Sequence, residues 1–283
     1  MVEDNEIKAQ VSPFAIREGE IKTFDGKDGY VSMNQIVHKI NIGHITDIHF
    51  AILDLVNEFE FITSRQIYQM LEIKGIDPKS QDKLNNKLDA LVKSKILTRY
   101  YFTSDEGKGI YRIYCLEKMG KYLLTSKEVE CKWQPSDNTK PVPMIKKRLA
   151  GNQVLIAYLR KVKAFDSYVV KPAITAKTLG KVFKATGGSV KLTKNNKSIQ
   201  FLFEAVRREF DWQKKLVEKM NLYKDFYENF QPGDSGFAGL QGKFCRSGFY
   251  SSCWTGRNLA FERCKSASGK GDENQKLSDC HAF

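Results

Sequence analysis

Long apolar runs are missing from this sequence: no stretch of about 18 apolar residues occurs, which is the length that a membrane-spanning helix needs. The N-terminus, MVEDNEIKAQ, is acidic and does not lead from basic residues into an apolar segment, so it does not have the pattern of a secretory signal. These two absences predict a cytoplasmic protein without a membrane partner.

Motifs for metals and nucleotides are also missing. None of the six cysteines forms a Cys-x-x-Cys pair, and the four histidines show no spacing such as His-Glu-x-x-His. Thr186-Gly187-Gly188 is not followed by the Lys-Ser or Lys-Thr pair of a phosphate-binding loop. We therefore expect reduced thiols, no cofactor, no metal site and no nucleotide-driven motor.

Positive charge is present in excess, but it is unevenly distributed. The net charge is +13, yet residues 1–124 hold 17 basic and 18 acidic side chains, which leaves 29 basic and 15 acidic for the remainder. Residues 140–197 hold 14 basic side chains and a single acid, Asp166. A field of one sign over that length favours a polyanion such as nucleic acid, although a solvated lysine-rich surface is the alternative.

Residues 44–126 show the pattern of a winged helix-turn-helix. Apolar residues recur at helical spacing after Thr46, and Thr63 to Gln66 has the spacing of a capping box that begins a second helix. Ser80 can cap a third helix with a stripe of leucines. Two aromatic, β-branched segments, residues 96–102 and 110–116, then predict a hairpin, and residues 117–126 a closing helix.

In such a module the third helix enters the major groove and the hairpin contacts the DNA backbone. Side-chain amides near the start of the third helix can read adenine, and lysines suit phosphates. The N-terminus of the second helix is a further place for a phosphate. The predicted contacts to double-stranded DNA are Ser64, Arg65, Gln66, Gln81, Lys83, Asn85, Asn86, Lys87, Lys93, Arg99, Lys108 and Arg112.

The rest of the chain divides by composition. Residues 1–43 form an N-terminal arm, with either a short hairpin around Asp25 to Gly29 or little order, and proline-rich residues 127–143 form a linker. Residues 144–234 predict a basic α/β domain with one mixed sheet in the order α-β-β-β-α. Residues 235–283 lack periodicity, which indicates a disordered tail or one translated out of frame. The predicted fold class is α+β.

The segments TSRQIYQML, KLNNKLDALVKSKILTRYYF and GIYRIYCLEKMGKYLL resemble the replication-relaxation family of plasmids and conjugative elements. The resemblance implies a winged helix followed by a domain similar to the restriction-endonuclease fold, and a role in plasmid maintenance. A nuclease of that fold needs two carboxylates for Mg²⁺ and a lysine nearby. Glu204-Ala205-Val206 has no lysine at the third position, so we expect a degenerate domain in which Glu204 pairs with Arg207, Arg208 or a neighbouring lysine.

The sequence thus predicts a non-enzymatic, sequence-selective DNA-binding protein that serves replication, relaxation or transfer of a mobile element, or their control. A replication or conjugation complex is a further expected partner, and a homodimer is left open. The alternatives are a metal-dependent nuclease and a winged-helix adaptor that contacts only proteins.

Overall fold

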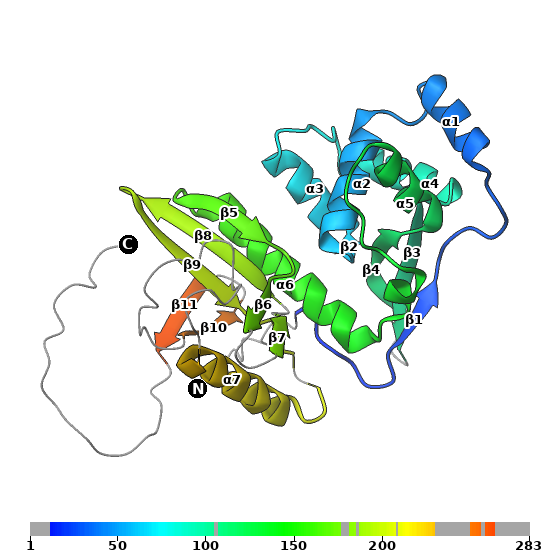
Figure 1. The fold of residues 1–283 in the computed structure, drawn as a ribbon. Helices are drawn as coiled ribbons and strands as arrows, with labels where there is room; N and C mark the ends of the chain where they lie inside the picture. The colour runs from blue at the N-terminus through cyan, green and yellow to red at the C-terminus, as the bar shows by residue number, and fades with distance from the viewer. Residues whose placement is uncertain are drawn as a thin grey trace, which may run out of the picture. The chain divides into compact units, whose positions relative to one another are not determined.

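The computed structural model describes residues 12–104, 107–176, 181–184, 187–207, 209–229, 250–255 and 258–263. The elements up to residue 229 lie in one compact unit (Figure 1). Strands β10 (Tyr250–Thr255) and β11 (Asn258–Arg263) belong to a second unit and pair as an antiparallel hairpin. Regular structure therefore occurs inside the segment that the sequence predicts to be disordered; the rest of that segment lies outside the described residues. None of the helices described is long and apolar enough to cross a membrane.

Most helices of the first unit lie where apolar periodicity predicts them, whereas the helix at residues 33–41 and the 3-10 turn at residues 135–139 were not predicted. Their bounds, with one 3-10 turn η1, are α1 (Met33–Asn41), α2 (Asp47–Phe59), α3 (Ser64–Ile73), α4 (Gln81–Lys93), α5 (Lys118–Ser126), η1 (Pro135–Thr139), α6 (Val142–Lys161) and α7 (Trp212–Asn229).

The predicted hairpin is present as β3 (Leu97–Ser104) and β4 (Gly107–Leu116). Strand β2 (Ile62–Thr63) pairs with β4, and β1 (Ile21–Phe24) pairs antiparallel with the other edge, β3 (Figure 1). Residues 21–24 of the N-terminal arm therefore join this sheet instead of forming a local hairpin.

Helices α2 to α5 enclose a core whose largest members are completely buried. Leu55, Val56 and Phe59 of α2 pack with Leu84 and Leu88 of α4 in this core. A second apolar cluster joins the hairpin to α6, since Phe102 of β3 and Cys115 of β4 pack with Ile145 and Leu149. The first helix of the predicted second domain thus shares a core with the elements that precede the predicted linker.

The second sheet consists of β5 (Phe165–Val169), β8 (Gly188–Lys194) and β9 (Lys197–Phe203) in the order β5-β8-β9, and both pairings are antiparallel. The prediction of a mixed sheet is therefore wrong for the described strands. A separate hairpin of β6 (Ala173–Ala176) and β7 (Lys181–Lys184) was not predicted. The structure confirms the coarser prediction of an α+β chain.

Gly151 explains how α6 approaches this sheet so closely. A Cβ atom at Gly151 would lie 2.8 Å from both the Cα and the carbonyl oxygen of Gly187, which directly precedes β8. A glycine in the middle of a helix normally weakens that helix. In the structure its missing side chain permits contact between two backbones.

Candidate nucleic-acid interface

Helix α4 presents a polar face opposite its buried leucine stripe. Ser80 begins the helix, and its Oγ accepts a hydrogen bond from the backbone N–H of Lys83 at 3.2 Å. Leu84, Leu88, Leu91 and Val92 are buried. Lys83, Asn86 and Lys93 are exposed, so three of the predicted DNA contacts lie on the surface of this helix.

The amide side chains near the start of α4 are not equivalent. Gln81 donates from Nε2 to Oδ1 of Asn85 at 3.2 Å, and both residues are partly buried. Asn86 is exposed, and among the described residues it forms no such amide pair. Asn86 is therefore the amide best placed to reach a base edge, while the Gln81–Asn85 pair would have to exchange its mutual bond for one to a base.

The capping box that begins α3 is present as predicted, but it places Gln66 in the interior. Gln66 is completely buried; its Oε1 accepts from Thr63 N–H at 3.2 Å and its Nε2 donates to the Leu149 carbonyl at 2.8 Å. The predicted DNA contact at Gln66 is therefore not accessible, and this side chain instead ties α3 to α6. Arg65 is exposed and Ser64 is half-buried at the same helix end.

Arg99 and Arg112 of the hairpin are engaged by carboxylates. Arg99 contacts Asp25 through Nε at 3.1 Å and hydrogen-bonds Asp89 of α4, while Arg112 contacts the same Asp25 oxygen at 2.8 Å. The Arg99 side chain is 14% exposed and that of Arg112 is 50% exposed. Arg99 thus links β1, β3 and α4 and is a poor candidate for a phosphate contact, whereas Arg112 remains within reach of solvent. The Lys108 side chain lies outside the part of the hairpin that the structure describes.

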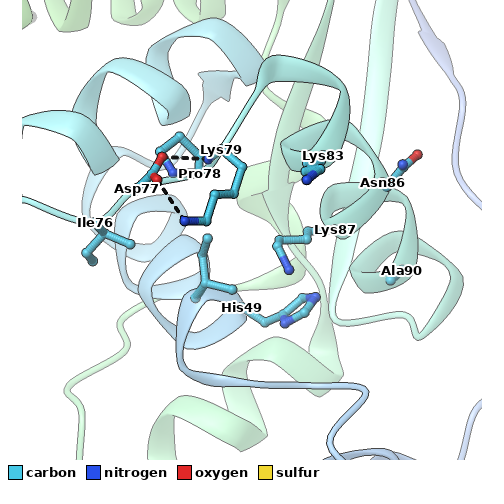
Figure 2. A pocket seen from close by; sticks show the side chains of 10 residues that line it. His49, Ile76, Asp77, Pro78, Lys79, Lys83, Asn86, Lys87 and Ala90 are labelled. Carbon is cyan, nitrogen blue, oxygen red and sulfur yellow. Dashed lines mark hydrogen bonds and ion pairs between the residues drawn. The ribbon is translucent and has the colours of Figure 1, made fainter.

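A cavity of about 580 Å³ opens beside α4. It is lined by residues of α2, of the turn between α3 and α4, and of α4, namely Ile48, His49, Ile76, Asp77, Pro78, Lys79, Lys83, Asn86, Lys87 and Ala90. Figure 2 shows Lys87 directed towards the His49 imidazole, with Asn86 pointing away from it. Lys79 forms an ion pair with Asp77 at 3.0 Å. No ion pair of Lys83 or Lys87 occurs among the described residues.

His49 is the least expected member of this cavity. Its residue is 5% exposed, and its Nδ1 lies 3.1 Å from the Thr46 backbone N–H, from which it accepts a hydrogen bond. Burial, together with the positive charge of Lys87, lowers the pKa of His49 to about 4. The imidazole is therefore neutral near pH 7, and its proton is assigned to Nε2 because Nδ1 is an acceptor. The Thr46-x-x-His49 spacing was the available sequence signal, since it places His49 where a capping box has Glu or Gln.

The basic segment 140–197 carries less uncompensated charge than its composition indicates. Carboxylates from elsewhere in the chain, or Asp166, pair with seven of its cations: Lys140, Lys146, Lys147, Arg148, Arg160, Lys171 and Lys191. Lys161, Lys163 and Lys197 are exposed. The positive surface that remains for a polyanion is therefore smaller than the residue count suggests.

Glu204, the acid considered for metal-dependent chemistry, contacts two residues of α7. It accepts a hydrogen bond from the Tyr223 hydroxyl and lies 3.3 Å from Lys219 Nζ. This confirms the expected pairing with a neighbouring lysine. Asp166, the single acid of residues 140–197, forms an ion pair with Lys191 at 3.0 Å. No group of three or more His, Cys, Asp or Glu suited to a metal ion occurs within the described ranges.

Residues 53–240, more than half of the chain, match the family model described as replication-relaxation. No match to the chain was found among curated proteins or among solved structures.

Proposed function

Since this chain belongs to the replication-relaxation family, we propose that it is a sequence-selective protein that binds double-stranded DNA of a plasmid or mobile element. In this proposal α2, α3 and α4 with the hairpin β3–β4 form a winged helix-turn-helix, and α4 enters the major groove. The protein would serve replication, relaxation or transfer of that element, or their control.

The face of α4 is the observation that supports this proposal most strongly. It combines an exposed amide, Asn86, with the lysines Lys83, Lys87 and Lys93, on a helix whose opposite side is fixed in a fully buried core. Rigid placement of an amide among cations is what base reading with backbone anchoring requires. Asp89 points from the same helix, but its charge is paired with Arg99 and so opposes a phosphate less.

We propose a supporting and non-catalytic role for the second sheet and α7. Glu204, the carboxylate considered for Mg²⁺, and Asp166, the single acid of residues 140–197, each contact a lysine of the chain itself. Exposed lysines of this part, such as Lys163 and Lys197, would add contacts to DNA or to a replication or conjugation complex.

The experiment that tests the proposal is selection of bound fragments from element DNA, followed by gel-shift titration of the selected site against a scrambled duplex. Replacing Asn86 by alanine should reduce the preference for the selected site by about 5- to 150-fold, because one bidentate contact contributes roughly 1–3 kcal/mol of discrimination. Asn85→Ala should act in the same direction.

Arg112→Gln is the matched comparison, because a phosphate contact carries no sequence information. This variant should weaken binding to the selected and scrambled duplexes by similar factors and leave their ratio unchanged. Retention of the full site preference in both asparagine variants would show that α4 does not read the bases.

A further inference from the structure

The cavity beside α4 combines an imidazole N–H donor with two cations that have no ion-pair partner among the described residues. His49 faces it from α2, and Lys83 and Lys87 lie one helical turn apart on α4. Because Nδ1 of His49 is held by the backbone of Thr46, the nitrogen left for a ligand is Nε2, which has no hydrogen bond within the described structure. Although the residue is only 5% exposed, this ring nitrogen is not among the fully buried side-chain atoms that lack a partner, so a ligand in the cavity can reach it.

We infer that this cavity is a phosphate-binding site, in which Lys83 and Lys87 neutralise the phosphate and the His49 Nε2–H donates to one of its oxygens. The inference goes beyond surface contacts of the two lysines, because it assigns them a common ligand and adds a residue from another helix. Where the phosphate belongs to the DNA backbone, the inference rests on the proposed function.

The composition of the cavity favours a phosphate over other anions. His49, Lys83 and Lys87 place three donor groups from two helices around one space. A phosphate offers at least two unbridged oxygens and also bridging oxygens as acceptors, whereas a carboxylate offers only two oxygens. Ile48, Ile76, Pro78 and Ala90 line the same space. Apolar walls lower the local dielectric constant and so strengthen the attraction between the lysines and the anion.

Lys79 does not weaken this assignment. Its ammonium group is paired with Asp77 at the mouth of the cavity, and both side chains are largely exposed. The pair contributes little net charge, so the field inside the cavity is determined mainly by Lys83 and Lys87. Figure 2 shows the Lys87 side chain between the helix and the imidazole.

Calorimetric titration of the full chain with inorganic phosphate and with deoxyadenosine monophosphate, and gel-shift titration with a duplex, test the inference. The double variant Lys83→Gln/Lys87→Gln should lose about 10-fold or more in affinity for whichever probe the wild type binds. With the duplex, the slope of log K against log salt should become shallower by about one, since a single shared phosphate is lost.

Lys118→Gln is the matched control, because Lys118 is exposed on α5 and does not line the cavity. It should leave affinity unchanged. His49→Glu keeps an acceptor for the Thr46 N–H and puts a negative charge in the cavity, so it should abolish binding of the phosphate while unfolding measurements confirm a folded chain.

The possible outcomes separate the source of the phosphate from the inference itself. If the wild type binds the two small probes and the double variant does not, the ligand of the cavity is a free phosphate or nucleotide. If the double variant weakens only duplex binding, the bound phosphate belongs to the DNA backbone. The inference is overturned if the double variant and Lys118→Gln bind the duplex equally well and neither small probe binds. That result leaves the proposed function standing. Small-probe binding without duplex binding supports the site and contradicts the proposed function.

Discussion

Replacing Lys146 by methionine should lower the free energy of unfolding by about 4 kcal/mol, the largest effect expected for a single substitution in this chain. The Lys146 and Glu20 side chains are 3% and 6% exposed, and the ammonium nitrogen lies 2.5 Å from a carboxylate oxygen of Glu20. It also donates to the Ala15 carbonyl. Removal of the cation leaves the buried Glu20 carboxylate without the ammonium group that compensates its charge. Equilibrium denaturation with urea provides the measurement.

The double variant Lys146→Met/Glu20→Leu separates loss of packing from loss of charge compensation. A buried ion pair replaced by apolar residues of similar size is often close to neutral, so the double variant should recover most of the stability lost in either single variant. If the stability losses of the two single variants simply add in the double variant, this account is contradicted. The result bears on the N-terminal arm, since Glu20 directly precedes β1 and fixes the arm to α6.

Glu60→Gln should cost about 3 kcal/mol. Glu60 lies just after α2, its side chain is 8% exposed, and it receives a hydrogen bond from Lys140 and an ion pair from Lys171 at 2.8 Å. Burial alone would raise the pKa of Glu60, but Lys171 and Lys140 outweigh it and the pKa lies below its usual value. The neutral amide would remove the anion that Lys171 and Lys140 share, although Lys140 keeps its ion pair with Asp137 at 3.1 Å. Because both cations are partly exposed, we expect a cost at the low end for buried pairs.

Glu72→Gln is the matched control for this variant. Glu72 also pairs with a cation of α6, Arg160, but at 3.6 Å and with both side chains more than 40% exposed. Its loss should cost less than about 1 kcal/mol. Equal costs for the two variants in urea denaturation would show that Glu60 does not organise a buried network between α2, α6 and the segment after β5.

Local patterns were sufficient to predict the helices and the hairpin of residues 44–126. Capping residues and apolar periodicity are properties of a few consecutive residues, and Thr63, Ser80 and the leucines of α4 behave as their spacing predicts. The same reasoning could have found α1, because Ser32 and Gln35 form a capping box. Met33, Ile36, Val37 and Ile40 also recur at helical spacing in α1, where Ile36 is the buried residue.

Partners that are distant in sequence could not be predicted in this way. Asp25 lies 74 residues before Arg99, and Gln66 lies 83 residues before Leu149, whose carbonyl it binds. Charge counting fails for the same reason: the acids that neutralise residues 140–197, such as Glu20 and Glu60, belong to the N-terminal part of the chain. Composition describes the total charge of a segment, whereas compensation depends on the fold.

The candidate site was predicted in part. Asn86, Lys83 and Lys87 lie on an accessible side of α4, because a helical wheel places them away from the leucine stripe. His49 was not predicted, since its role depends on the packing of α2 beside α4. Arg99 and Gln66 have the right chemistry for DNA, but the structure uses their donors within the protein.

The most direct measurement of the central claim is the affinity of the full chain for duplex DNA over a series of salt concentrations. Contacts from Lys83, Lys87, Lys93 and Arg112 to a few phosphates predict a linear fall of log K with log salt, with a slope between about −2 and −4. A slope near zero, or no binding at low salt, would contradict the claim that the face of α4 binds DNA.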